Sequence, residues 1–103
     1  MRLVILLAVL CLPGCASEEG VQRRWDEFVA DHSECDVADD CAIVYPGCPL
    51  GCFDTVNVDH VEEAEDLADR LIRQYEFSGR SCQYDCAEAP DPVCDAGSCA
   101  LPL

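Results

Sequence analysis

The stretch CDVADDCAIVYPGCPLGC, residues 35–52, holds four of the ten cysteines of this chain. Its middle part, Cys41–Tyr45, is rich in β-branched and aromatic residues and ends at Pro46-Gly47, a pattern that predicts a strand followed by a loop. A second β-rich run follows at residues 53–58. The simplest interpretation is therefore a pair of strands joined by the loop 46–51.

Amphipathic segments flank this pair of strands on both sides. Before it, apolar side chains recur at helical spacing from Val21 to His32, and Ser17 is placed to cap the helix. After it, Asp59 is a candidate N-cap and Gly79 a candidate end of a second helix. The apolar stripe of this second helix consists of Val61, Ala64, Leu67, Ala68, Leu71, Ile72 and Tyr75.

The C-terminal quarter contains the remaining cysteines of the domain and few core-forming residues. Residues 93–101 predict a short hairpin, with Gly97 at the left-handed position of its turn. The chain therefore predicts a small, disulfide-rich α+β fold with two helices, a two-stranded β unit and a C-terminal Cys-rich hairpin.

The N-terminus carries a targeting pattern. Arg2 precedes an apolar run from Leu3 to Leu12, and Leu12-Pro13-Gly14-Cys15 follows. Ten residues at about 1.5 Å each reach only about half of a bilayer core, which argues against a membrane span. The order of charge, apolar run and small residue before cysteine resembles bacterial lipoprotein signal peptides, and residues 12–15 match their lipobox.

This resemblance implies a lipid-anchored protein. Residues 1–14 would be removed, Cys15 would become the acylated first residue, and residues 15–20 would form a short tether to a globular domain at 21–103. Ala16 is not the aspartate associated with retention in the inner membrane, so the resemblance implies the outer membrane of a bacterial envelope, at its periplasmic face or the cell surface. Ordinary secretory cleavage after Ala16 is the alternative, because Gly14 and Ala16 are both small.

Either cleavage leaves the same eight cysteines in the domain. In an oxidising compartment, an even number in so short a chain predicts four disulfides, although 105 pairings are open. The two Cys-x-x-x-Cys units at 48–52 and 82–86 leave a four-thiolate zinc site as a less favoured alternative. The predicted disulfide cysteines are Cys35, Cys41, Cys48, Cys52, Cys82, Cys86, Cys94 and Cys99.

Charge restricts the classes of partner. After loss of Arg2, five arginines and no lysine stand against 21 carboxylates, giving a net charge of −16 for the processed chain. Such a surface repels nucleic acid and anionic headgroups. The expected partners are the bilayer, through the acyl group on Cys15, and a protein; no nucleic acid and no small-molecule substrate are expected.

Motifs for catalysis are weak. His32 and His60 are the only histidines, and each fits a structural role at the end or start of a helix better than a catalytic one. The acidic group Asp36, Asp39 and Asp40 lacks the alternating oxygens of an EF-hand loop, so a solvated turn is favoured over calcium binding. We therefore expect no enzyme, no cofactor and no metal site.

Two functions remain from the sequence. The leading expectation is a noncatalytic, disulfide-stabilised binding or structural domain of an exported lipoprotein. The alternative is a protease inhibitor that presents the loop Pro46–Cys52, with Leu50 offered to a specificity pocket. The inhibitor hypothesis requires Leu50 to be exposed and to contribute little to the core.

Overall fold

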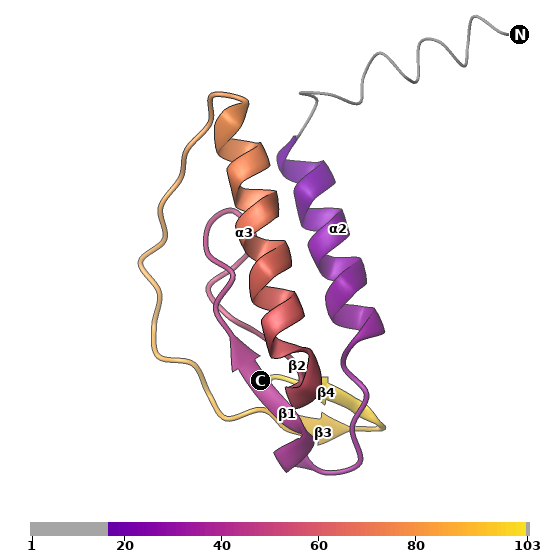
Figure 1. The fold of residues 1–103 in the computed structure, drawn as a ribbon. Coiled ribbons are helices and arrows are strands. Elements are labelled where there is room, and N and C mark those ends of the chain that lie inside the picture. The colour runs from indigo at the N-terminus through magenta and orange to yellow at the C-terminus, as the bar shows by residue number, and fades with distance from the viewer. Residues whose placement is uncertain (1–16, 103) are drawn as a thin grey trace, which may run out of the picture.

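The computed structural model describes residues 17–102, so the predicted signal peptide and Cys15 lie outside the described residues. Two helices pack beside one antiparallel strand pair, and a second strand pair closes one end of the molecule (Figure 1). The fold is therefore the predicted disulfide-rich α+β type. Its elements are α2 (Glu18–Asp31), η1 (Ala38–Asp40), β1 (Cys41–Val44), β2 (Asp54–Asn57), η2 (Val58–His60), α3 (Val61–Phe77), β3 (Val93–Asp95) and β4 (Ser98–Ala100).

Helix α2 begins where the sequence predicts a cap. The Ser17 hydroxyl accepts a hydrogen bond from the backbone N–H of Gly20 at 3.0 Å, which satisfies one of the free donors of the first turn. Glu18 and Glu19 lie in that turn, where carboxylates are favoured by the helix dipole. Residues 18–20, which the sequence assigns to the tether, are therefore part of α2.

Strands β1 and β2 pair antiparallel, with Cys41 opposite Asn57 and Val44 opposite Asp54. The loop between them closes on itself through a bridge between Gly47 and Gly51. Gly47 has a φ of 96°, a left-handed conformation that a side chain would strain.

Leu50, within this loop, points into the core and is only 4% exposed. The expectation of an exposed Leu50 is therefore wrong. The closed loop turns its single large apolar side chain inward, where it packs in the main core cluster.

Helix α3 follows its predicted stripe but starts differently. Asn57 caps the preceding turn η2, because its side-chain oxygen accepts the N–H of Asp59 at 2.8 Å. The N-cap of α3 itself is His60, which makes no side-chain capping bond. The predicted cap at Asp59 is wrong, because Asp59 lies inside η2 and this turn is capped two residues earlier, at Asn57. At the other end, Gly79 lies just beyond the helix with a φ of 91°, as the sequence predicts.

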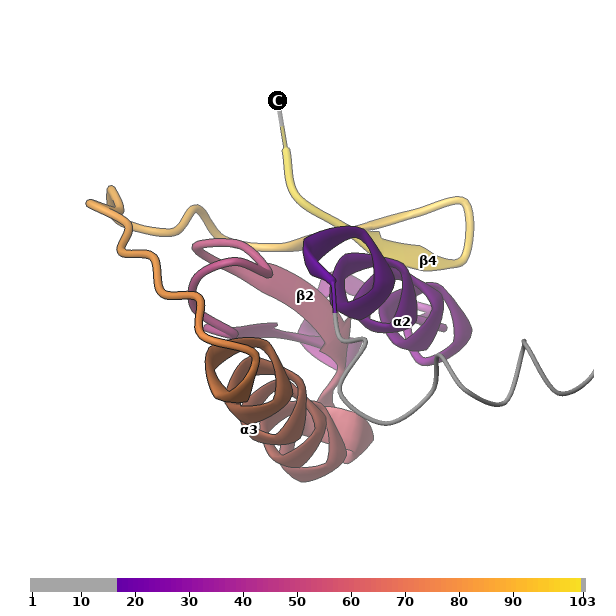
Figure 2. The same ribbon diagram turned by 90° about the horizontal axis from the view of Figure 1, so that it is seen from above.

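The predicted stripe of α3 faces the core. Seen along the helix axes, α2 and α3 lie beside each other, and the β3–β4 hairpin lies on the side of the molecule away from α3 (Figure 2). One cluster of buried side chains joins both helices, both central strands and the loop. It consists of Val21, Trp25, Val44, Leu50, Val56, Ala64, Ala68, Leu71 and Tyr75.

The chain from Ser78 to Pro92 has no regular secondary structure and returns along the outside of the fold to the C-terminal hairpin (Figure 1). We call residues 78–92 the strap. In the hairpin that follows, Ala96 and Gly97 both have positive φ, at 54° and 84°, which gives the tight two-residue turn between β3 and β4. The strap buries little surface, so its position depends on cross-links.

All eight cysteines of the domain form disulfides, as the sequence predicts. The pairs are Cys35–Cys94, Cys41–Cys99, Cys48–Cys82 and Cys52–Cys86. The first two attach the C-terminal hairpin, and the last two attach the strap to the loop Pro46–Cys52. None of the helices between residues 17 and 102 combines the length and the apolar character that a membrane span requires.

Candidate functional site: a histidine–carboxylate cluster

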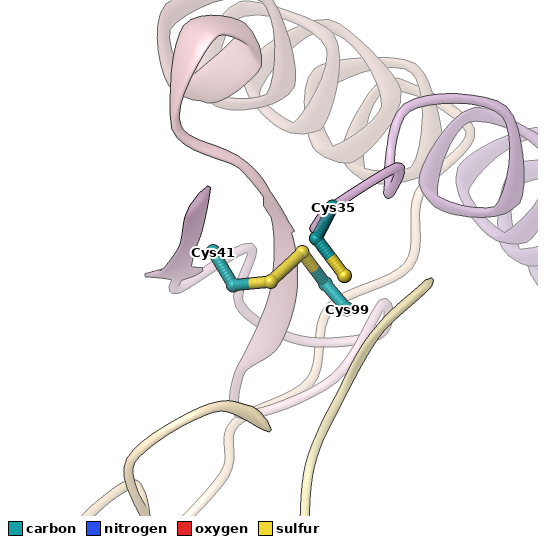
Figure 3. A group of neighbouring side chains, drawn as sticks. All are labelled: Cys35, Cys41 and Cys99. Carbon is teal, nitrogen blue, oxygen red and sulfur yellow. A yellow bond between two sulfur atoms is a disulfide. The ribbon is translucent and has the colours of Figure 1, made fainter. Parts of the chain in front are cut away.

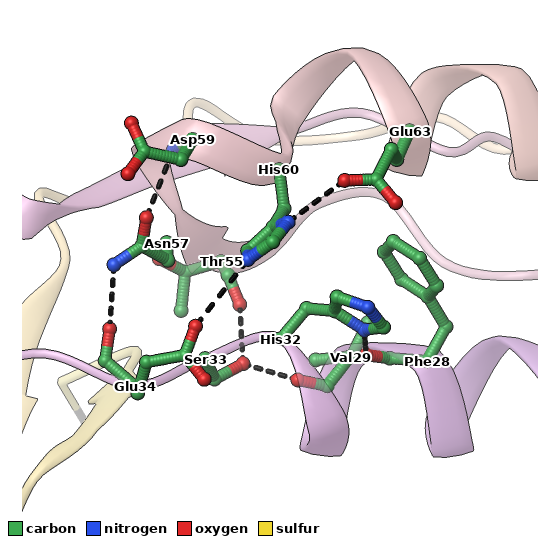
Figure 4. Close-up of polar contacts among 10 residues, drawn as sticks. All are labelled: Phe28, Val29, His32, Ser33, Glu34, Thr55, Asn57, Asp59, His60 and Glu63. Carbon is green, nitrogen blue, oxygen red and sulfur yellow. Dashed lines mark hydrogen bonds and ion pairs between the residues drawn. The ribbon is translucent and has the colours of Figure 1, made fainter.

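The two histidines of the chain meet where the C-terminal end of α2 approaches the N-terminal end of α3 (Figure 4). Their ring centroids are 4.7 Å apart and the rings are nearly perpendicular, at 77°. With Glu34 and Glu63 they form what we call the histidine cluster: His32, Glu34, His60 and Glu63. Twenty-eight residues of sequence separate the two rings, so their contact is a product of the tertiary fold.

The His32 ring is held on two sides. It stacks on Phe28 with a centroid distance of 3.9 Å and an interplanar angle of 16°. Its Nδ1 lies 2.8 Å from the backbone carbonyl oxygen of Phe28. A carbonyl oxygen can only accept a hydrogen bond, so Nδ1 carries the hydrogen and, in the neutral ring, Nε2 keeps its lone pair.

The His60 ring contacts a carboxylate at each nitrogen. Nδ1 is 2.8 Å from Oε1 of Glu63, three residues later on α3, and Nε2 is 3.4 Å from Oε1 of Glu34. The hydrogen bond to Glu63 is the main cause that raises the pKa of the His60 imidazole, and the same contact lowers the pKa of Glu63. Both carboxylates are largely exposed, so the cluster opens to solvent.

Asn57 connects the two segments that carry the histidines. Its backbone N–H donates to the carbonyl of His32 at 2.8 Å, and its side-chain Nδ2 donates to the carbonyl of Glu34 at 2.8 Å. Its Oδ1 accepts the N–H of Asp59, next to His60. One residue therefore fixes the distance between the end of α2 and the start of α3 (Figure 4).

Buried hydroxyl contacts support the same junction. The Ser33 hydroxyl lies against the carbonyls of Val29 and Thr55, and the Thr55 hydroxyl donates to the carbonyl of Ala42 at 2.9 Å. Both side chains are buried, and such buried polar groups stabilise a structure only when they are hydrogen-bonded. The backbone beneath the histidine cluster is thus tied to both central strands.

Sequence reasoning gave each histidine a separate structural role and missed their meeting. It also missed Glu34 and Glu63 as their partners. The spacing of His60 and Glu63, three apart at the start of a predicted helix, was the one available signal, because such residues share a helix face. Nothing local in the sequence connects either of them with His32.

The clustered cysteines offer no metal ligands. The sulfurs of Cys35, Cys41 and Cys99 lie close together in the interior (Figure 3), but each belongs to a disulfide. The two Cys-x-x-x-Cys units also meet, as a zinc site would require, but they are linked to each other as Cys48–Cys82 and Cys52–Cys86. Disulfide sulfur is not the thiolate that binds zinc, so the four-thiolate alternative is wrong for this oxidised fold.

The acidic turn at residues 36–40 satisfies its own backbone. Oδ2 of Asp40 accepts the N–H of Asp36 at 2.8 Å and of Val37 at 3.2 Å, and these bonds lower the pKa of Asp40. This use of the carboxylate fits the predicted solvated turn. The loop Pro46–Cys52 cannot offer Leu50 to a protease, because that side chain is in the core.

Among the described residues, the histidine cluster brings together two imidazoles and two carboxylates, which are groups that can exchange protons or bind a metal ion. His32, His60 and Glu63 each place a ligand atom within 4.8 Å of the other two. Comparisons with protein-family models, with characterised proteins and with solved structures find no match to this chain.

Proposed function

We propose that this protein is an exported lipoprotein of the bacterial envelope, anchored through Cys15, whose stapled domain serves as a noncatalytic binding or structural module. The observation that carries the proposal is the pairing of all eight domain cysteines downstream of a lipobox-type leader. Disulfides of this density persist in oxidising compartments such as the periplasm or the cell surface. The leader and the disulfides therefore both support a location in an oxidising compartment outside the cytoplasm.

The pattern of cross-links supports a rigid presented surface. Two disulfides attach the hairpin to Cys41, the first residue of β1, and to Cys35, in the segment that leads into β1. The other two attach the strap to the loop Pro46–Cys52. The strap also makes a direct contact, because the Tyr84 hydroxyl donates to the carbonyl of Pro49 at 3.0 Å. A surface fixed in this way loses little conformational entropy when it binds a partner.

The start of α2 supports a domain held close to its anchor. Ser17 caps α2, and only Ala16 separates it from Cys15. The helix thus begins next to the acyl anchor. Its 14 residues rise about 21 Å, so His32 lies at the end remote from the bilayer attachment.

Replacing Cys15 by Ala tests the anchor. We expect the variant to lose labelling by a fatty-acid probe and to move from the membrane to the soluble fraction. Cys11→Ala is the matched control, since it removes a neighbouring cysteine but leaves residues 12–15 intact. Labelling and membrane attachment that persist in Cys15→Ala would overturn the lipid anchor.

The mass of the intact exported protein tests the domain itself. Alkylation without reduction should add nothing to the eight domain cysteines, and reduction followed by alkylation should label all eight. Free thiols in the exported protein would contradict a fully stapled module. The same spectrum distinguishes an acylated N-terminus at Cys15 from plain cleavage after Ala16.

A further inference from the structure

The histidine cluster combines features that separate a metal site from an ordinary surface ion pair. Two imidazoles and one carboxylate come from the end of α2, from η2 and from the first turn of α3, and their donor atoms lie within 4.8 Å of one another. Two donors of a tetrahedral zinc ion lie roughly 3.3 Å apart, given bonds of about 2.0–2.1 Å. The ligand atoms must therefore approach by at most roughly 1.5 Å. Oε1 of Glu63 already lies 2.8 Å from Nδ1 of His60, so the remaining approach is between this pair and the His32 ring.

The second ring nitrogen of each histidine already has a partner. Nδ1–H of His32 donates to the carbonyl of Phe28, which directs Nε2 away from the helix. Nε2 of His60 faces the carboxylate of Glu34, which leaves Nδ1 beside Glu63. A carbonyl or carboxylate behind each imidazole is the outer shell that metal-ligating histidines normally have, and it fixes tautomer and ring orientation.

The surroundings favour a cation. Both carboxylates of the cluster are within contact of His60, and Glu63 shares the wall of an open pocket with Phe28, Asp66, Leu67 and Arg70. His32 follows the last turn of α2, where the helix dipole favours positive charge, although His60 precedes α3, where it does not. The chain as a whole carries a net charge of −15, which raises the local concentration of cations.

We propose that His32, His60 and Glu63 form a binding site for a divalent transition metal of the zinc class, with Glu34 as an outer-shell partner. Imidazole donors select zinc, copper or nickel over calcium and magnesium, which prefer oxygen. Zn²⁺ suits a set of two imidazoles and one carboxylate that leaves a fourth position open to solvent. Because four disulfides already hold the fold, the ion is bound by a formed domain and is not required for folding.

Titration of Zn²⁺ into the purified exported protein tests the site. The sample carries no histidine tag, and any free thiol is alkylated first. We expect one saturable equivalent, and at least a tenfold loss of affinity in His32→Ala, His60→Ala and Glu63→Gln. Glu34→Gln should weaken binding by a smaller factor, as outer-shell changes do.

Glu62→Gln is the matched control, because Glu62 is the exposed neighbour of Glu63 in the same first turn of α3. It should leave the affinity unchanged. Equal losses in Glu62→Gln and Glu63→Gln would mean diffuse binding to an acidic surface and would overturn the site. Absence of saturable binding would overturn it as well.

Nuclear magnetic resonance provides a test that does not depend on variants. The chain has only two histidines, so its imidazole ring signals are few and assignable. One equivalent of Zn²⁺ should shift the signals of both rings together. A shift of one ring alone, or of neither, contradicts the proposed pair of ligands even if a variant fails to fold.

Discussion

The indole Nε1–H of Trp25 on α2 donates a hydrogen bond to Oδ2 of Asp54 on β2 at 2.8 Å. Trp25 is completely buried, so its single polar group needs an acceptor inside the protein. Asp54 is half-buried at the start of β2 and supplies that acceptor. Burial is the main cause that raises the pKa of Asp54, and the bond from Trp25 opposes it.

Two substitutions of Asp54 distinguish the contribution of its charge to stability from the contribution of its hydrogen bond with Trp25. Asp54→Ala leaves the indole N–H buried without a partner, and we expect a loss of about 1–3 kcal/mol in the free energy of unfolding. Asp54→Asn keeps an acceptor oxygen and removes the buried charge, so it should remain within about 1 kcal/mol of the unsubstituted protein. Denaturant unfolding at pH 7 measures both. Equal destabilisation by the two variants would show that the carboxylate charge itself is required.

The raised pKa of Asp54 also predicts a pH dependence. In the unfolded chain this carboxyl titrates near 3.8, and in the folded state it titrates higher, so the folded state holds the proton more tightly. The contribution of Asp54 to stability is therefore complete below pH 3.8 and is lost as the pH rises through the folded-state pKa. The free energy of unfolding of the unsubstituted protein minus that of Asp54→Asn should therefore fall as the pH rises from 3.8 through the folded-state pKa. A difference that rises with pH would contradict the direction of the shift.

Regular spacing made parts of this fold predictable. The stripe from Val61 to Tyr75 is read directly from its helical period, and Ser17 and Gly79 mark helix ends by local chemistry. The disulfide pairing was not predictable, because each bridge joins segments at least 34 residues apart. The contact of His32 with His60 depends on the packing of α2 against α3, for which the sequence contains no local signal.

Asn57 tests how the histidine cluster is positioned. Asn57→Ala removes the side-chain bonds to Glu34 and Asp59, and we expect a loss of about 1 kcal/mol in stability. Asn57→Asp keeps the acceptor for the Asp59 N–H and loses only the donor to Glu34. It should therefore be destabilised less than Asn57→Ala. In both variants, contacts between the two histidine rings in nuclear Overhauser spectra should weaken; unchanged contacts would show that other residues fix the ring positions.

The two pairs of disulfides should differ in their effect on the core. Each bridge has a neighbour that spans nearly the same loop, so loss of one bridge changes chain entropy little while its neighbour remains. The loss of stability on removing a bridge then depends mainly on how deeply its two cysteines are packed. Cys41 and Cys99 are each only 8% exposed, whereas Cys86 lies in the exposed strap.

We therefore expect Cys41→Ala/Cys99→Ala to lower the thermal midpoint more than Cys52→Ala/Cys86→Ala. The second variant should instead speed amide hydrogen exchange and proteolysis within the strap, 78–92, and leave the helices protected. If the Cys52–Cys86 variant unfolds the helices first, the strap contributes to the core in a way that its exposure does not indicate.

Leu50 is buried although the sequence predicts that it is exposed, so its substitution tests the conformation of the loop Pro46–Cys52. Its side chain packs in the main core cluster, and it is held there by the loop closed between Gly47 and Gly51. Leu50→Ala should cost about 2–5 kcal/mol by leaving a cavity, and Leu50→Asp should cost more because it buries a charge. Tyr45→Ala is the control, since Tyr45 precedes the same loop and is 68% exposed. Thermal or denaturant unfolding should show a small change for Tyr45→Ala. A stable, native Leu50→Asp protein would restore the exposed loop that an inhibitor requires and would contradict the burial of Leu50.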